Sequence, residues 1–180
     1  MNQQEIAYEL AKKAHEGEFR RDGITAYFNH VLDVARIAGD RFGFDDELIA
    51  TALLHDFFEE NPSKTTSDLL NAGISAKIVE AVVLLTHIKR GKSKESYQDY
   101  ITFLKNSNNQ LAIKVKIADN LANLADSPTD KQILKYAKSL QILMSWSYRF
   151  KLNLCQTFAR LFLIHRAKLF CNKMANGLMF

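Results

Sequence analysis

The stretch ATALLHDFFEEN, residues 50–61, changes abruptly from apolar to polar at His55-Asp56. Its apolar half is typical of a buried helix face, and the proline at position 62 ends the pattern. We predict one helix over residues 45–60, with His55 and Asp56 near its polar end. Two interpretations follow: the polar end reaches solvent, or its side chains gather around a metal ion. Residues elsewhere in the chain decide between them.

Helical spacing of apolar residues recurs along most of the chain, which has only two prolines and seven glycines. Helices are also predicted over residues 3–16, 30–43, 65–73, 75–87, 97–107, 109–126 and 130–145. Connections this short are typical of antiparallel neighbours in an all-α bundle. We therefore expect an all-α fold, with residues 1–145 as one domain.

Composition and cysteine usage restrict the class of protein. Hydrophobic residues make up 47% and charged residues 24% of the 180 positions, which are ordinary globular values. Cys155 and Cys171 do not form a CxxC pair, and we interpret them as free thiols in a reducing compartment. Without an apolar signal region or an 18-residue apolar run, the chain is expected to be cytoplasmic.

Charge is distributed unevenly, because residues 1–130 hold all 20 acidic residues and 15 Lys/Arg, whereas residues 131–180 hold nine Lys/Arg. The segment 146–180 is basic and rich in aromatic residues. We favour one or two helices that pack on the same domain, either within one chain or at a homodimer contact. The alternatives are contact with nucleic acid or an anionic membrane, and an end altered by truncation or a frame shift.

Two further residues belong with His55-Asp56. His30 opens the helix at 30–43, directly after a loop, and Asp119 interrupts an apolar helical stripe. A carboxylate on such a stripe needs a partner, because burying an unpaired charge is costly. A metal ion is one such partner. Together the four residues would offer mixed nitrogen and oxygen ligands, which suit Mn²⁺, Fe²⁺ or Zn²⁺.

The order His…His-Asp…Asp over three helices resembles the HD-domain metal-dependent phosphohydrolases. Among these, the chain is most similar to the hydrolase domain of the Rel/SpoT alarmone enzymes and to the small alarmone hydrolases. Three stretches carry the resemblance, which covers roughly residues 5–145: AKKAHEGEFRRDGITAYFNHVLDVA at 11–35, LIATALLHDFFEEN at 48–61 and VKIADNLANL at 115–124.

The resemblance implies an HD-domain helical bundle and a role for each matching residue. The implied metal ligands are His30, His55, Asp56 and Asp119, with Mn²⁺ as the first expectation and Fe²⁺ or Zn²⁺ as alternatives. Glu59 would orient or deprotonate the attacking water, and Glu60 would either assist it or be a solvated helix end. The implied substrate contacts are Asn123 and one of Arg20 and Arg21. His15 also matches a family position, and we interpret it as packing at a helix end.

The implied reaction is removal of the 3′-pyrophosphate from guanosine 3′,5′-bis(diphosphate), abbreviated ppGpp, or its relatives, giving GDP or GTP. Asn120 and Ala122 replace residues that are typical of the family near the substrate. Two alternatives therefore stay open: a phosphohydrolase for nucleoside monophosphates or NADPH, and a nucleotide-binding module without catalysis. A basic loop, Lys89, Arg90, Lys92 and Lys94, is interpreted as solvated, with a contact to the pyrophosphate as the alternative.

Overall fold

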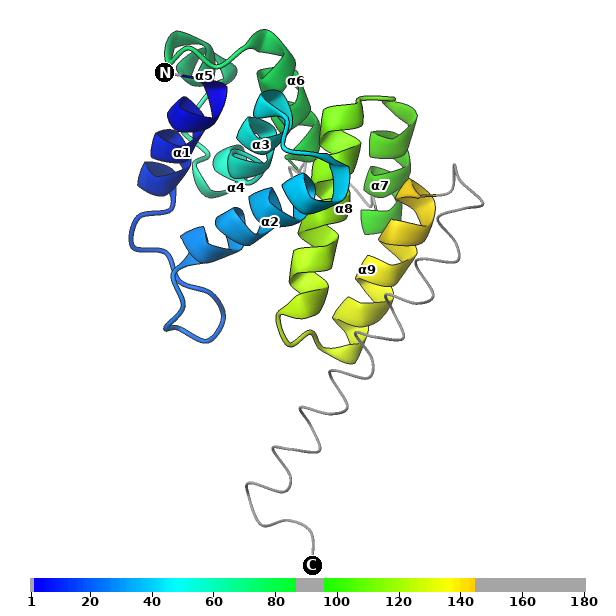
Figure 1. Cartoon of the computed structure of the whole chain (residues 1–180). Helices are drawn as coiled ribbons and strands as arrows, with labels where there is room; N and C mark the ends of the chain where they lie inside the picture. Colours follow the sequence, from blue (N-terminus) through cyan, green and yellow to red (C-terminus); the bar gives the residue numbers. More distant parts are fainter. Residues whose placement is uncertain (1, 87–95, 145–180) are drawn as a thin grey trace, which may run out of the picture. The chain divides into compact units, whose positions relative to one another are not determined.

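The computed structural model describes residues 2–86 and 96–144 (Figure 1). Its helices are α1 (Gln3–Ala14), α2 (Tyr27–Phe42), α3 (Asp46–Leu53), α4 (Phe57–Glu60), α5 (Thr66–Asn71), α6 (Ala76–Leu85), α7 (Tyr97–Asn106), α8 (Gln110–Ala125) and α9 (Asp130–Leu143). The described residues form no strand beyond one isolated antiparallel bridge between Phe19 and Ala26. The all-α prediction is confirmed. The chain divides into two compact units, Met1–Ala122 and Asn123–Phe180.

Side-chain caps explain where several helices begin. Asn2 starts α1 with a capping box, in which its side chain accepts from Glu5 and Glu5 accepts from the Asn2 backbone. Ser75 caps α6, with its side chain accepting from the backbone N–H of Ile78. At the other end of α2, Gly43 has a φ of 96°, a conformation that glycine adopts without strain.

The predicted single helix over residues 45–60 is wrong in one respect. Helix α3 ends at Leu53, residues 54–56 form a turn, and α4 follows at Phe57. The Ala52 carbonyl accepts from the backbone N–H of His55 at 3.4 Å and from His55 Nδ1 at 2.8 Å. Both bonds draw the chain into a tighter turn. Thus His55 and Asp56 lie in the turn itself and not on a continuous helix.

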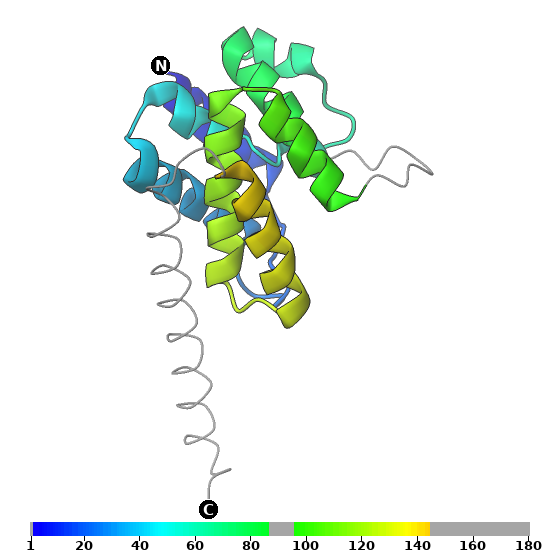
Figure 2. The same ribbon diagram turned by 90° about the vertical axis from the view of Figure 1, so that its right-hand side faces the viewer.

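Helix α3 lies at the centre of the first unit, in contact with α1, α2 and α6. Figures 1 and 2 show α1, α2 and α3 together from two directions. Leu48, Ala50 and Leu54 are buried at this centre. Farther along the chain, the Tyr100 hydroxyl of α7 donates to the carbonyl oxygen of Leu85 at 2.6 Å, which ties α7 to the end of α6. This frame holds the turn between α3 and α4 in place.

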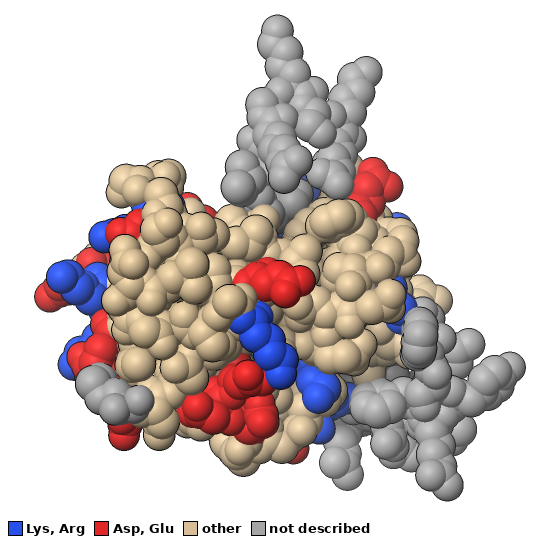
Figure 3. Space-filling model, turned by 90° about the horizontal axis from the view of Figure 1, so that it is seen from above, with Lys and Arg blue, Asp and Glu red and all other residues tan. Residues whose placement is uncertain are grey.

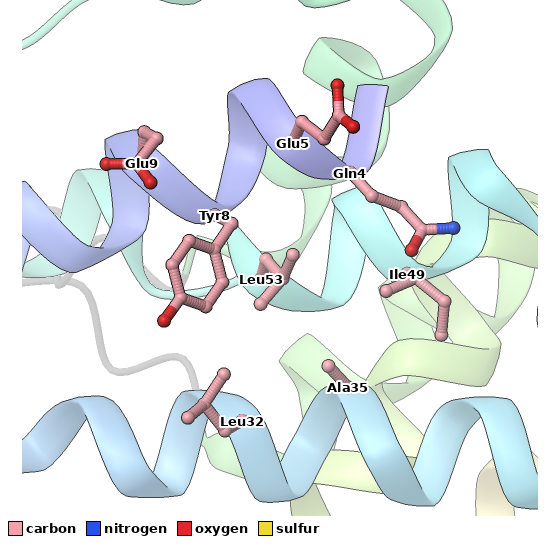
Figure 4. A pocket seen from close by; sticks show the side chains of 8 residues that line it. All are labelled: Gln4, Glu5, Tyr8, Glu9, Leu32, Ala35, Ile49 and Leu53. Carbon is pink, nitrogen blue, oxygen red and sulfur yellow. The ribbon is translucent and has the colours of Figure 1, made fainter. Parts of the chain in front are cut away.

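A shallow hollow lies between α1, α2 and α3 (Figure 4). Its lining residues are Gln4, Glu5, Tyr8, Glu9, Leu32, Ala35, Ile49 and Leu53. None of these is an expected site residue, so the hollow is separate from the candidate site.

The surface of the described residues carries both signs of charge. On the face shown in Figure 3, acidic and basic side chains lie close to one another among uncharged residues, without one continuous basic area among the residues that are coloured. Within residues 2–86 and 96–144, no helix is both long and apolar enough to cross a bilayer.

The second unit is described only as far as Met144. Its helix α9 begins at Asp130, after the N-cap residue Thr129, whose side chain forms a capping box with Gln132. The expectations for the basic loop at Lys89–Lys94 and for the segment 146–180 lie outside the described residues. The domain boundary at 145 therefore stays a prediction.

Candidate metal centre

Three of the expected ligands come together inside the first unit. His30 lies on the first turn of α2, and His55 and Asp56 lie in the turn between α3 and α4. One nitrogen or oxygen atom from each residue falls within 4.8 Å of the other two. The rings of His30 and His55 meet edge to face, with centroids 5.5 Å apart. We call these three residues the His/Asp cluster.

His55 is held with one ring nitrogen toward the cluster. Its Nδ1 must donate to the Ala52 carbonyl, because a carbonyl oxygen can only accept. Nε2 is buried and has no hydrogen-bond partner among the described residues. It lies 2.9 Å from Asp56 Oδ2, a close electrostatic contact without hydrogen-bond geometry. A bond from Nδ1 to a carbonyl is a common way to orient a metal-binding histidine.

Asp56 is positioned by Tyr27, a residue that no sequence motif indicated. The Tyr27 hydroxyl, from the start of α2, donates to Asp56 Oδ2 at 2.5 Å. The Tyr27 ring also packs edge to face on His30 and lies against His15, with centroids 5.5 and 5.0 Å apart. Tyr27 therefore contacts two members of the cluster. The buried His15 accordingly packs at the end of α1, as interpreted from the sequence.

Asp119, on α8, joins the cluster through His30 and has a second partner. Its Oδ1 lies 3.4 Å from His30 Nε2, and its Oδ2 lies 2.9 Å from the ammonium nitrogen of Lys116. Both Asp119 and Lys116 are buried. The apolar stripe around Asp119 predicted a partner for its carboxylate, but not this lysine. Residues three apart on a helix are neighbours, but this spacing alone does not show that the lysine is buried.

The electrostatics of the cluster are those of a cation site. Burial alone raises the pKa of Asp119, but Lys116 outweighs it, with help from both histidines, and holds that pKa well below its usual range. Burial likewise raises the pKa of Asp56, and His55 reverses this. Burial lowers the pKa of His55, whereas Asp56 and Asp119 raise it to about 9. The two carboxylates thus stay ionised and favour positive charge between them.

These donors fit a divalent metal ion. His30 and His55 offer imidazole nitrogens, Asp56 and Asp119 offer carboxylate oxygens, and the buried Nε2 of His55 is left without a hydrogen bond by the protein. Imidazole suits Zn, Fe and similar ions, and carboxylate suits Mn. His30, His55 and Asp56 could hold such an ion, with Asp119 beside them.

The two expected catalytic acids lie on α4, directly after the turn. Glu59 is exposed, and its charge is among those that raise the pKa of Tyr100. Its backbone N–H donates to the carbonyl oxygen of Asp56 at 3.1 Å, so the turn that holds Asp56 also places Glu59. Glu60 ends α4, and its side chain lies outside what the structure describes.

The loop before α2 distinguishes Arg20 from Arg21. The guanidinium carbon of Arg20 lies 5.7 Å from the centre of the Tyr27 ring, whereas Arg21 is exposed at the loop surface. Asp22 shapes this loop by accepting from the backbone N–H groups of Ile24 and Thr25. A bond from the Thr25 hydroxyl, together with these two backbone bonds, lowers the pKa of Asp22 to about 2. Arg20 is therefore the arginine that lies beside Tyr27, the residue that contacts His30 and Asp56.

The remaining expected substrate contact and the two departures from the family pattern lie on α8. Asn123 is four residues after Asp119 along the helix, is half-buried, and belongs to the second unit. Asn120 is fully buried and accepts from the Tyr97 hydroxyl at 3.1 Å. Ala122 is also buried. The bond to Tyr97 holds the Asn120 side chain in the interior. The expectation that positions 120 and 122 lie near the substrate stays a prediction.

The chain is similar in sequence to parts of several larger curated proteins. Guanosine-3′,5′-bis(diphosphate) 3′-pyrophosphohydrolase of Aquifex aeolicus is 34% identical over 122 residues, which are 66% of this chain and 17% of that protein. Bifunctional (p)ppGpp synthase/hydrolase SpoT of Escherichia coli is 29% identical, over 84% of this chain and 22% of that protein. GTP pyrophosphokinase of Streptomyces coelicolor is 25% identical, over 85% and 18%.

This chain thus spans about a fifth of the length of the curated relatives that it matches. The family described as HD domain matches residues 7–143, which include every residue of the cluster, Asp119 and Lys116. That match covers most of the sequence and agrees with the all-α fold and with the histidines and aspartates that the first unit brings together. The chain belongs to the HD domain family.

Proposed function

We propose that this chain is a metal-dependent phosphohydrolase that removes the 3′-pyrophosphate from ppGpp-type nucleotides. The single observation that carries the proposal is the convergence of His30, His55 and Asp56, whose ligand atoms lie within 4.8 Å of one another in a largely buried site. The names of the similar proteins from Aquifex aeolicus and Escherichia coli support this substrate class.

In this proposal His30, His55, Asp56 and Asp119 hold one divalent ion. Mn²⁺ is the proposed native ion, because a mixed set of imidazole and carboxylate ligands suits it, with Fe²⁺ and Zn²⁺ as competitors. A bound ion would polarise a phosphoryl oxygen and make attack by water easier at neutral pH. Tyr27 orients the Asp56 carboxylate, and the Ala52 carbonyl fixes the ring of His55.

Glu59 is proposed to accept a proton from the attacking water. It stands at the turn that carries Asp56, and it is exposed, so water and substrate can reach it. The water oxygen forms a bond to the phosphorus attached to the ribose 3′ oxygen, and the bond between that phosphorus and the 3′ oxygen breaks. The proton returns to the 3′ oxygen, so ppGpp and water give GDP and pyrophosphate. Glu60 is proposed to assist from the end of α4.

Arg20 is the proposed contact for the anionic or aromatic part of the nucleotide. Its guanidinium is planar and suits both phosphate oxygens and a base face, and it lies over Tyr27, next to the cluster. Arg21 is the alternative if the loop shifts when substrate binds. Asn123 is proposed as a second contact on the substrate.

The test is a substrate panel with the full-length chain and Mn²⁺. We expect release of pyrophosphate from ppGpp to be faster than phosphate release from NADPH or nucleoside monophosphates, and EDTA to abolish it. Asp56→Asn should abolish activity. The matched control, Asp33→Asn, makes the same chemical change at an exposed site on α2 whose carboxylate pairs with Arg36, and it should leave activity intact.

Two results would contradict the proposal. Faster turnover of NADPH or a monophosphate would agree with the proposed metal site but would contradict the proposed substrate class. Equal activity in Asp56→Asn and Asp33→Asn would remove the cluster from the chemistry and favour a nucleotide-binding role without catalysis.

A further inference from the structure

Lys116 is a buried cation next to a proposed metal site that is itself built to hold a cation. Its side chain is 10% exposed, and its ammonium nitrogen lies 2.9 Å from Asp119 Oδ2. The other oxygen of the same carboxylate lies 3.4 Å from Nε2 of His30, a member of the His/Asp cluster. One carboxylate therefore joins the lysine on one side to the cluster on the other.

The surroundings leave this lysine little freedom to leave Asp119. Its ammonium nitrogen lies 5.7 Å from the centre of the Tyr100 ring, so the ring face adds to the attraction. Tyr100 is in turn fixed by donating to the carbonyl oxygens of Leu85 at 2.6 Å and Leu84 at 3.2 Å. The ammonium group of Lys116 is thus held in place by residues of α7 and α8.

We propose that Lys116 is a built-in counter-ion that competes with the metal ion for Asp119 and thereby limits how tightly the site binds it. This inference rests on the proposed function, because it assumes that Asp119 serves the metal ion. Without the ion, Lys116 keeps the buried carboxylate neutralised and the protein folded. With it, two cations share one carboxylate, and their repulsion in a buried site exceeds what it would be in water.

The proposal predicts that removing the charge of Lys116 lowers the stability of the metal-free protein but tightens its binding of Mn²⁺. Lys116→Met keeps a long, unbranched side chain that is one atom shorter, and removes its charge. The melting temperature of the metal-free protein should fall, because Asp119 is left buried without its cation. The dissociation constant for Mn²⁺ should also fall, by roughly tenfold or more, because the repulsion is gone. A residue that only orients Asp119 would instead raise that constant by about 10–100-fold when removed.

The experiment titrates Mn²⁺ alone into the full-length protein and follows the free ion by electron paramagnetic resonance, with melting curves in EDTA and in Mn²⁺. Lys114→Met is the matched control, since it makes the same change on the same helix and its ammonium lies near the Phe42 ring instead. It should leave the Mn²⁺ affinity unchanged. Lys116→Met/Asp119→Asn removes both charges and should recover part of the melting temperature while losing Mn²⁺ affinity.

The outcomes separate the two proposals. Tighter Mn²⁺ binding by Lys116→Met, or folding of that variant only when Mn²⁺ is present, supports the counter-ion. Equal or weaker Mn²⁺ binding by Lys116→Met overturns the counter-ion proposal, and so does failure of that variant to fold even at millimolar Mn²⁺. In either case, Mn²⁺ binding by the wild type leaves the proposed function standing. A wild-type protein that binds no Mn²⁺ overturns both.

Discussion

The stability of the metal-free protein should depend on pH through His55, and the sign is opposite to that of an ordinary buried histidine. Burial alone would lower the pKa of His55, but Asp56 and Asp119 raise it from 6.5 to about 9. A group with a raised pKa in the fold contributes stability that is fully present below pH 6.5. That contribution is lost as pH rises through about 9. At 1.36 kcal/mol per pH unit, the loss amounts to about 3 kcal/mol of unfolding free energy.

Urea denaturation followed by far-UV circular dichroism, in EDTA at pH 6, 7.5 and 9, measures this loss. The His55→Gln variant should be less stable than wild type at pH 6 and similar to it above pH 9, so its curve is flatter. With saturating Mn²⁺ the decline should vanish or reverse, because a metal-binding imidazole must be deprotonated. If wild type and His55→Gln respond equally to pH, or if metal-free wild type gains stability toward pH 9, the electrostatic account of the cluster is wrong.

Three further variants test individual parts of the site and core. Tyr27→Phe removes the hydroxyl that donates to Asp56 and should weaken Mn²⁺ binding by about 10–100-fold in calorimetric titration; an unchanged affinity would exclude the positioning role. Glu59→Gln should lower the kcat for ppGpp by roughly 10²–10⁴-fold while keeping Mn²⁺ affinity, and the opposite pattern would make Glu59 a ligand. Leu54→Ala empties a fully buried position and should cost about 2–5 kcal/mol in urea denaturation, so a loss below about 1 kcal/mol would contradict the packing.

Much of the fold was predictable because it depends on local patterns. Apolar spacing predicted the helices, and Ser75 and Gly43 marked a beginning and an end by the chemistry of their caps. The break between α3 and α4 was not predictable in this way. Residues 45–60 have a continuous helical pattern. At the break the Ala52 carbonyl accepts from the His55 ring, a bond that the sequence pattern does not indicate.

The candidate site was likewise only partly predictable from the sequence. His30, His55 and Asp56 could be picked out because each places a polar group beside an apolar helical pattern, and the structure brings them together. Tyr27 was missed, because a tyrosine at a helix start gives no sequence signal that its hydroxyl reaches Asp56. Lys116 was missed for a different reason. A lysine is ordinarily solvated, and only its burial beside Asp119 shows that it neutralises that carboxylate.

The most direct test of the proposed function is the identity of the phosphorus-containing product. Full-length protein, Mn²⁺ and ppGpp should give GDP and pyrophosphate in equal amounts by ³¹P nuclear magnetic resonance, with no product when Asp56→Asn replaces the wild type. Release of orthophosphate instead of pyrophosphate, or no reaction by a wild-type protein that binds Mn²⁺, would contradict the account.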